Sequence, residues 1–324
     1  MNQEEEMVSA IESTVTFWDG SHRSLDSPER LIPFGSSSVQ HGTAVFEGIR
    51  CYSTSTGPAL FRLEEHLTRL LESARLIGIR HDYDLERLRS AVLRATVASR
   101  LSDCYVRPGL FATAPELSID LGRVEFTLGV EVWPIAPDAH TDASKPEGTQ
   151  LTISAWDRPL PSSFPSRAKA VGTYVTSALA KTSAVDAGYD DAIQLDPLSG
   201  RVAEATVSNI FLVRDGVVRT PWLSDSILEG ITRDSVLALT GELGIPTCEE
   251  PVEVADLWSA DEVFLTGTAS ELVPVSSIDD HHYPANSPVF QAISEAYEGA
   301  ATGKDFDWLN WLTPVPADTV ATAR

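Results

Sequence analysis

Residues 204–233 read EATVSNIFLVRDGVVRTPWLSDSILEGITR, and this stretch decides how the second half of the chain folds. Apolar and β-branched residues flank Asp215-Gly216 on both sides, which predicts a β-hairpin around a two-residue turn. Gly230 then opens a predicted helix that closes near Gly244. A hairpin that leads into a helix indicates a domain built from both strands and helices.

Helical and strand-like patterns continue in both directions from this stretch. Leucine and alanine recur at helical spacing in two consecutive segments, which predicts two amphipathic helices. Other segments have the pattern of strands, and Asp19-Gly20 is expected to form another hairpin turn. The predicted helices cover 64–79, 84–100, 168–190, 231–245 and 288–302, and the predicted strands include 104–113, 125–133, 151–156, 191–196 and 261–269.

Length and one proline-rich segment predict two domains. The chain has 324 residues, and a domain usually takes roughly 100–200. Residues 134–148, PIAPDAHTDASKPEG, contain three prolines and almost no large apolar side chains, which is typical of a linker. We therefore predict a small N-terminal α/β domain over 1–133 and a larger domain over 149–324.

Charge and composition exclude several classes of partner. The net charge is −23, from 24 Lys and Arg against 47 Asp and Glu, and such a surface repels nucleic acid and anionic lipids. No signal peptide and no membrane-spanning apolar segment are recognisable. The three cysteines form no CxxC pair, which favours free thiols in a reducing compartment. We expect a cytoplasmic protein that acts on small molecules.

Common motifs for phosphate, zinc and serine chemistry are missing from the sequence. No G-x-G-x-x-G follows a strand, and no Walker loop, HExxH or G-x-S-x-G occurs. The adjacent His281 and His282 lie in a polar segment, so we expect no metal site.

Four groups in the second half nevertheless suggest a ligand. Lys169, in SRAKAVGTY, stands among small residues that favour a nucleophilic amine, although a single such lysine is more often a surface residue. Glu204 lies in an apolar run and needs a partner there, either a cationic group of a ligand or a structural salt bridge. Gly230–Asp234 opens a helix whose amides can bind an anion, although an ordinary cap is the commoner use. Leu265–Ser270, LTGTAS, is a second candidate cradle for an anion.

Pyridoxal phosphate (PLP) requires these groups together. Its aldehyde forms an imine with an amine, its ring nitrogen needs a carboxylate, and its phosphate needs amide donors and a cation. A lysine, a carboxylate in an apolar run and a helix N-terminus in one half of the chain could meet these needs, although each alone has a commoner structural explanation.

The spacing of these residues resembles that of the class IV (fold-type IV) PLP-dependent aminotransferases. Lys169 stands 35 residues before Glu204, as the family's Schiff-base lysine does. Three N-terminal segments, HGTAVFEGIRCY (41–52), FRLEEHLTRL (61–70) and YVRP (105–108), resemble the branched-chain amino acid aminotransferases in particular. The resemblance covers about residues 15–312, and its C-terminal matches are Glu204, Asn209, Ile210, Phe211, Thr220, Leu228, Gly230, Ile231, Arg233, Gly267, Thr268 and Ala269.

The resemblance implies a fold, an assembly and a role for each site residue. The fold would be α/β (α+β), with a small N-terminal α/β domain and a larger PLP-binding domain that has a barrel-like β core and surrounding helices. The protein would be a homodimer. Lys169 would be the catalytic residue, forming the Schiff base and moving the proton. The other implied cofactor contacts are Glu204 to the ring nitrogen, Tyr174 to the phenolic oxygen, and Arg69, Ile231, Thr232 and Thr268 to the phosphate; the implied substrate contacts are Phe46, His41, Tyr105, Arg107 and Ala269.

The predicted reaction moves an amino group between a hydrophobic, branched-chain-like L-amino acid and 2-oxoglutarate, with Arg107 receiving the second carboxylate. Three positions depart from the family: His41 replaces a common Tyr, Glu229 replaces Pro, and residues 114–126 lack the usual Gly-rich loop. Alternatives with the same fold are a D-amino acid, (R)-amine or specialised biosynthetic transaminase, and aminodeoxychorismate lyase. A non-catalytic binding protein would be expected to lack Lys169 or Glu204.

Overall fold

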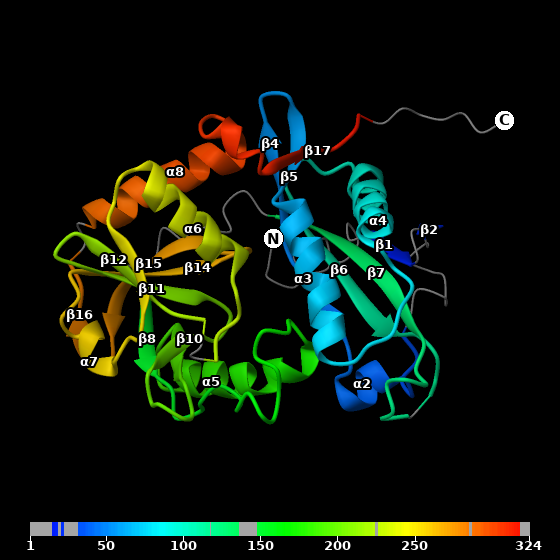
Figure 1. Cartoon of the computed structure of the whole chain (residues 1–324), viewed down its shortest axis with the longest axis horizontal. Helices are drawn as coiled ribbons and strands as arrows, with labels where there is room; N and C mark the ends of the chain where they lie inside the picture. The colour runs from blue at the N-terminus through cyan, green and yellow to red at the C-terminus, as the bar shows by residue number, and fades with distance from the viewer. Residues whose placement is uncertain are drawn as a thin grey trace, which may run out of the picture. The chain divides into compact units, whose positions relative to one another are not determined.

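The computed structural model describes residues 15–18, 21–22, 32–116, 118–135, 148–223, 226–284 and 287–317. The chain forms two units, whose elements are labelled in Figure 1. The first unit is Met1–Ala139, Ala168–Gly172 and Ala300–Arg324, and the second is His140–Arg167 and Thr173–Gly299. The domain limits at 133 and 149 stay a prediction, and most of the predicted linker lies outside the described residues. The short segment that carries Lys169 belongs to the first unit.

The first unit is built on an eight-stranded antiparallel sheet, with strand order β17-β5-β4-β6-β7-β1-β2 and β3 paired with β6. Its strands are β1 (Val15–Trp18), β2 (Ser21–His22), β3 (Val45–Phe46), β4 (Ile49–Thr54), β5 (Gly57–Phe61), β6 (Cys104–Ala112), β7 (Phe126–Pro134) and β17 (Leu312–Pro314). Its helices are α2 (Ser37–His41), α3 (Leu63–Leu76) and α4 (Leu85–Ser99), followed near the C-terminus by a 3₁₀ turn (Asp307–Leu309).

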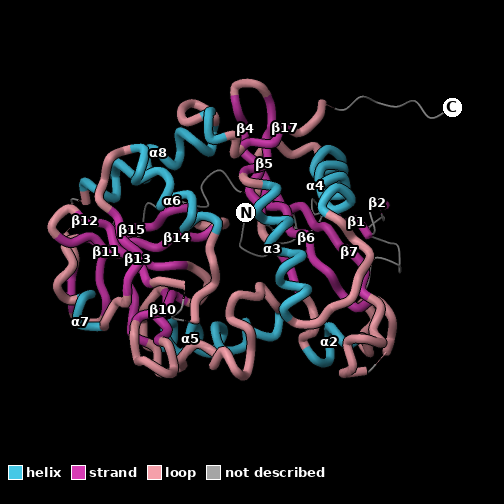
Figure 2. The backbone as a smooth tube through the Cα atoms, in the orientation of Figure 1, coloured by secondary structure: helices cyan, strands magenta, loops and turns pink. Residues whose placement is uncertain are grey.

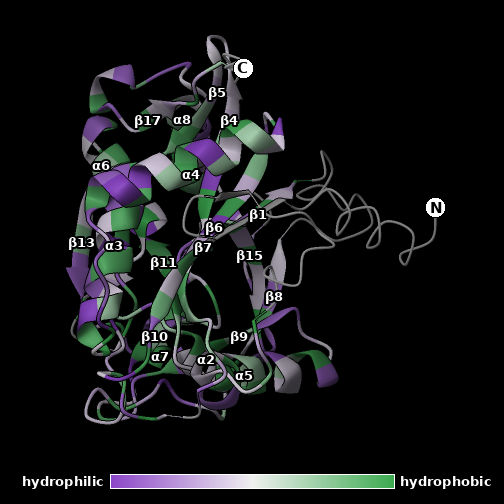
Figure 3. Ribbon diagram, turned by 90° about the vertical axis from the view of Figure 1, so that its right-hand side faces the viewer, coloured by the Kyte–Doolittle hydropathy of each residue, from purple (hydrophilic) through white to green (hydrophobic). Residues whose placement is uncertain are grey.

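Helices α3 and α4 pack on each other and on the sheet. The two helices confirm the sequence prediction of helices over 64–79 and 84–100. In Figure 3, apolar and polar residues can be followed along α4. Strand β6 alternates between the two faces: Val106 and Leu110 are fully buried, whereas Tyr105 and Arg107 remain accessible. The sheet therefore has an apolar face and a face with aromatic and charged groups.

The second unit contains a nine-stranded mixed sheet, drawn in magenta in Figure 2, with order β10-β9-β8-β15-β14-β11-β12-β13 and β16 paired with β15. Its strands are β8 (Thr149–Ile153), β9 (Asp191–Leu195), β10 (Val202–Ala205), β11 (Asn209–Arg214), β12 (Val217–Pro221), β13 (Thr247–Glu250), β14 (Glu262–Gly267), β15 (Glu271–Ile278) and β16 (His281–His282). Its helices are α5 (Tyr174–Asp186), which follows a 3₁₀ turn (Val171–Thr173), α6 (Ile231–Glu242), α7 (Val254–Leu257) and α8 (Pro288–Thr302), whose last residues belong to the first unit.

This sheet curls into a partial barrel. Strand β10 begins the strand order, yet it also contacts β11 and β12 near the other end. Side chains of β11 point alternately to two cores: Ile210 and Leu212 join one cluster, and Phe211 and Val213 join another that includes residues of α6 and α8. Burial on both faces explains why the strand is a continuous apolar run. The predicted mixed α/β architecture is confirmed.

The hairpin that opened the sequence argument is present. Strands β11 and β12 pair antiparallel, and the turn between them has positive φ at both Asp215 (53°) and Gly216 (73°). Aspartate and glycine tolerate that left-handed region, which explains the two-residue turn. The predicted Asp19-Gly20 turn lies outside the described residues, although its neighbours Trp18 and Ser21 pair with each other.

Three further observations concern the described residues alone. No helix among them is long and apolar enough to cross a bilayer. They contain no group of three or more potential metal ligands from His, Cys, Asp and Glu. The three cysteines are free thiols.

Candidate functional site

The predicted site residues fall in both units, and each set is described within its own unit. The first unit contains His41, Phe46, Arg69, Tyr105, Arg107 and Lys169. The second unit contains Tyr174, Glu204, Ile231, Thr232, Thr268 and Ala269.

Lys169 is held by its backbone beside β3. The Phe46 amide donates to the Lys169 carbonyl at 3.1 Å, and Val45 and Ala170 form an antiparallel bridge. The Lys169 amide donates to Ser73 Oγ of α3 at 3.0 Å. The lysine is half-buried, and its Nζ lies 5.1 Å from the centre of the Phe46 ring. These main-chain contacts fix the backbone from which the amine projects.

A buried carboxylate that the sequence analysis overlooked, Glu47, follows Phe46. Arg69 binds it with two parallel bonds, Nε to Oε1 at 2.6 Å and Nη2 to Oε2 at 2.8 Å. His66 Nδ1 lies 2.7 Å from Glu47 Oε2. Both partners come from α3, one turn apart, so the helix presents them together to the carboxylate.

The ionisation states of Glu47 and His66 depend on burial and on their contacts with each other and with Arg69. Burial raises the pKa of the Glu47 carboxyl, but the charge and hydrogen bonds of Arg69, together with His66, outweigh it and hold this pKa far below its usual range. Burial lowers the pKa of the His66 imidazole, and the hydrogen bond to Glu47 opposes this only in part. At neutral pH His66 is therefore uncharged and donates from Nδ1 to the ionised Glu47.

Arg69, predicted to bind phosphate, presents only one edge of its guanidinium to Glu47. A guanidinium has five N–H donors in a planar fork, and the bonds to Glu47 use the Nε–Nη2 edge. The phosphate contact of Arg69 stays a prediction. An acidic residue in the apolar run VFEGI carries the same signal that identified Glu204, and this signal could have found Glu47.

Three of the predicted substrate residues lie together on one face of the first sheet. Tyr105 and Arg107 share a face of β6, and the Arg107 guanidinium lies 4.2 Å from the centre of the Phe46 ring. A Cβ atom on Gly48 would lie 1.8 Å from the Tyr105 hydroxyl, so only glycine lets this tyrosine pack there. His41 is the exposed last residue of α2, and its Nδ1 lies 3.5 Å from Ser37 Oγ.

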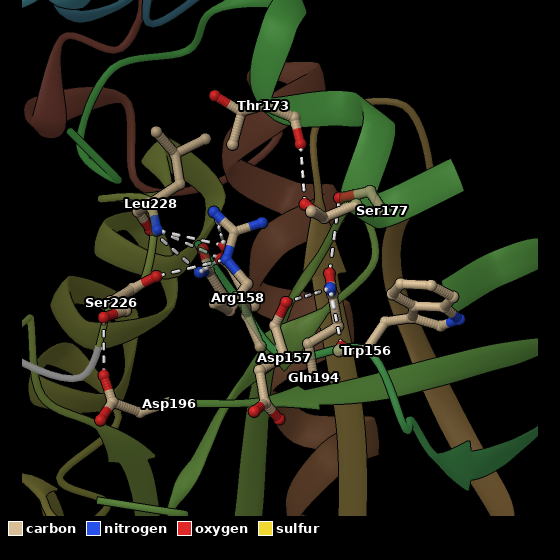
Figure 4. A network of polar contacts seen from close by, with 12 residues as sticks. Trp156, Asp157, Arg158, Thr173, Ser177, Gln194, Asp196, Ser226 and Leu228 are labelled. Carbon is tan, nitrogen blue, oxygen red and sulfur yellow. Dashed lines mark hydrogen bonds and ion pairs between the residues drawn. The ribbon is translucent and has the colours of Figure 1, made fainter. Parts of the chain in front are cut away.

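Glu204 of β10 is the centre of a buried polar network in the second unit, part of which Figure 4 shows. Arg158 Nη2 lies 2.9 Å from Glu204 Oε1, and Asn209 Nδ2 donates to Oε2 at 2.9 Å. The Leu228 amide donates to the same carboxylate at 3.2 and 3.3 Å. The salt bridge that the sequence left open as an alternative is therefore present, and Arg158 is a site residue that the sequence analysis overlooked.

Helix α6 begins without a side-chain cap. Its N-cap is Gly230, where a Cβ atom would lie 1.9 Å from Asn209 Oδ1, so the close approach requires glycine. Ile231 and Thr232 form the first turn and are buried. An uncapped helix N-terminus with a hydroxyl in its first turn suits a phosphate.

The remaining predicted positions lie at strand and helix ends. Thr268 and Ala269 form the turn between β14 and β15, next to Thr266, whose buried hydroxyl has no hydrogen-bond partner among the described residues. Tyr174 is the first residue of α5. An amine, a buried carboxylate, an uncapped helix N-terminus and a positioned guanidinium are the groups that PLP needs, so the residues present fit this cofactor.

Comparison with known proteins supports the same chemistry. Residues 44–278 match the family model described as amino-transferase class IV. The chain is 36% identical over 290 residues to the branched-chain-amino-acid aminotransferase of Salmonella typhimurium, covering 86% of this chain and 91% of that protein. It is 36% identical over 315 residues to a probable branched-chain-amino-acid aminotransferase of Aquifex aeolicus, covering 95% and 99%.

Solved structures with the same fold carry similar names. The branched-chain aminotransferase of Thermoproteus uzoniensis with norvaline superposes with a TM-score of 0.86 at 37% identity, covering 93% of this chain and 99% of that one. The branched-chain amino acid aminotransferase of T.th. with pyridoxamine 5'-phosphate gives a TM-score of 0.87 at 35% identity, covering 93% and 98%.

Proposed function

Because the chain belongs to the class IV aminotransferase family, we propose that it exchanges amino groups between a branched-chain or similar hydrophobic L-amino acid and 2-oxoglutarate. The family confirms the predicted enzyme class, the fold-type IV architecture and the PLP cofactor. The names of the similar proteins support the branched-chain substrate, which is the proposal.

The observation that carries this proposal is the cluster of Phe46, Tyr105 and Arg107. Two aromatic side chains offer an apolar surface for a hydrophobic substrate, and the guanidinium beside them can receive a second carboxylate. One surface could thus accept leucine in one half of the reaction and glutamate in the other.

Each charged group would have a separate task. PLP, when bound, supplies the conjugated ring that takes up the electron pair released at the substrate α-carbon. The Lys169 amine would move the proton at that carbon. Main-chain contacts hold the backbone from which this side chain projects. Glu204 would face the ring nitrogen, while Arg69 and the first amides of α6 would hold the phosphate.

Half-reactions test the proposed substrates. The purified protein with PLP is mixed with one amino donor and no acceptor, and the cofactor spectrum is recorded. L-Leucine and L-glutamate should each convert bound PLP to pyridoxamine phosphate, whereas D-alanine and (R)-1-phenylethylamine should not. Conversion by only the D-amino acid or the (R)-amine would overturn the substrate assignment and leave the enzyme class intact.

Arg107→Ala should separate the two acceptor classes. We expect the KM for 2-oxoglutarate to rise at least about tenfold, because a charge-assisted hydrogen bond is lost. The KM for 4-methyl-2-oxopentanoate should change much less, since this acid has no second carboxylate. Steady-state kinetics with both acceptors measure this, and Arg94→Ala, at an exposed arginine of α4, is the control. Equal losses for both acceptors would show that Arg107 is structural.

We also propose that the protein is a homodimer. Phe34 and Ile119 of the first unit are 84% and 78% exposed. Their segments are adjacent, since Ser37 Oγ donates to the Ser118 carbonyl at 3.0 Å. Two large apolar side chains exposed on adjacent segments support a surface that a second copy of the chain would cover. Light scattering should give the mass of a dimer, and Ile119→Asp should shift it toward the monomer; a fully active wild-type monomer would contradict the proposal.

A further inference from the structure

Arg158 binds the carboxylate proposed to face the cofactor ring. Its Nη2 lies 2.9 Å from Glu204 Oε1, and the two side chains are only 5% and 7% exposed. Charges buried this deeply interact strongly, so the proton affinity of the carboxylate depends on the guanidinium. Arg158 therefore bears on any group that shares a proton with Glu204.

The guanidinium is itself held from a second side. Its Nε donates to the Ser226 carbonyl at 3.2 Å. Ser226 is buried with a left-handed φ of 60°, and its hydroxyl donates to Asp196 Oδ2 at 2.6 Å. Figure 4 shows the Arg158 side chain beside Leu228 and Ser226, with Asp196 beyond Ser226. A chain of hydrogen bonds thus aims the guanidinium at Glu204.

The backbone that carries Arg158 is tied to the strand beside Glu204. The Arg158 amide donates to the Leu195 carbonyl at 2.9 Å. Gln194, directly opposite Glu204 in the β9–β10 register, donates from its side chain to the Trp156 and Asp157 carbonyls at 3.1 and 3.3 Å. Both members of the ion pair are therefore fixed to the same pair of strands.

Resting on the proposed role of Glu204, we propose that Arg158 is a positioning residue for the cofactor ring nitrogen. It orients the carboxylate through Oε1 and keeps it ionised, so that Glu204 can pair with a protonated ring nitrogen. The donors Asn209 and Leu228 supply hydrogen bonds to the carboxylate but no positive charge, which comes from the guanidinium of Arg158. A buried carboxyl without that charge takes up a proton more readily, and a neutral acid pairs poorly with a cation.

Other titratable groups on the neighbouring elements have their own contacts. Asp191 on β9 accepts from Thr206, and Asp196 after β9 accepts from Ser226. On the flanking loops, Asp157 and Glu229 are exposed, and Glu229 pairs with Arg167 at 3.1 Å. Strand β11 presents the neutral Asn209 to Glu204. A change in protonation that follows loss of Arg158 is therefore assigned to Glu204.

The test is the affinity of the full chain for PLP as a function of pH. Apoprotein is titrated with PLP between pH 5.5 and 8.5, with binding followed by protein fluorescence, for the wild type, Arg158→Met and Arg158→Lys. The ratio of the Kd of Arg158→Met to that of the wild type should be at least about tenfold at pH 6 and should fall as pH rises. Arg158→Lys keeps the charge but not the two-sided geometry, so its Kd ratio should depend on pH less than that of Arg158→Met.

A purely structural role predicts a different result. In that case Arg158→Met would lower thermal stability while its Kd ratio stayed the same at every pH, and this outcome overturns the proposal. Ser226→Ala covers the case in which Arg158→Met does not fold, because it removes the hydroxyl anchor and keeps both charges. It should raise the PLP Kd about threefold, and an unchanged Kd contradicts the positioning role. Cofactor binding is the readout, so a wild type that binds PLP but fails the half-reactions would refute only the proposed function.

Discussion

Lys169→Ala should lower kcat for amino transfer at least about 10³-fold while leaving the fold intact. The side chain carries the proposed chemistry, whereas the contacts that fix this segment use main-chain atoms: the Lys169 carbonyl accepts from Phe46 and its amide donates to Ser73. Alanine keeps both contacts. Steady-state kinetics measure the loss, and the thermal midpoint should stay within a few degrees of the wild type.

A second lysine provides the control for this variant. Lys181 on α5 is half exposed and lies 3.7 Å from Asp191, which also accepts from Thr206, so Lys181→Ala should keep full activity. Borohydride should fix PLP covalently on the wild type and on Lys181→Ala but not on Lys169→Ala, as mass spectrometry would detect. Transaminase activity retained by Lys169→Ala would refute the proposed role of this residue.

Glu47→Ala should lower the free energy of unfolding by about 3–5 kcal/mol, because it leaves Arg69 largely buried without its carboxylate partner. It also removes the acceptor that holds His66. Urea unfolding at pH 7 measures the change. The matched control is Glu72→Ala, which breaks the exposed Glu72–Arg75 pair on α3, the helix that also carries Arg69. This change should lower the free energy of unfolding by less than about 1 kcal/mol. A similar loss of unfolding free energy in both variants would show that the buried Glu47 pair contributes no more to stability than an exposed pair.

The effect of Glu47→Ala should also depend on pH. The folded protein holds the pKa of Glu47 far below its usual value, so the unfolded chain takes up a proton on this residue first as pH falls. The stabilisation is fully present above the unfolded pKa of about 4.3 and is lost progressively below it. The difference in stability between wild type and Glu47→Ala should therefore shrink between pH 5 and pH 3. A difference that stays constant over this range would rule out the ionised Glu47.

Local patterns predicted the regular elements well. The helices at 231–242 and 288–302 and the hairpin at Asp215-Gly216 agree with the sequence prediction, because their spacing and turn residues act over a few positions. The Pro-rich and Ser-rich stretch between β8 and α5 was predicted only as a loop. In the structure this stretch carries Arg158 in the second unit and leads to Lys169 in the first. These placements depend on contacts with strands that are distant in the sequence.

The overlooked site residues share a physical cause. Glu47 meets His66 and Arg69, which lie 19 and 22 residues away, and Arg158 meets Glu204 from a separate loop. Glu47 and Glu204 each lie in an apolar run of the sequence, which indicates that each carboxylate requires a positively charged partner. The sequence around each glutamate does not indicate which of the chain's many arginines supplies the positive charge.

The sequence by itself predicted the chemistry, because Lys169, Glu204 and Gly230 follow one another in the order and spacing of a PLP aminotransferase, and the family match confirms the enzyme class and the cofactor. Only the tertiary structure decided how these groups are held. Backbone bonds to β3 assign Lys169 to the first unit, and a buried guanidinium from a loop fixes Glu204 in the second. The physical reason is that reactive groups are specified residue by residue, whereas their charge state and orientation depend on partners that only folding brings within hydrogen-bonding distance.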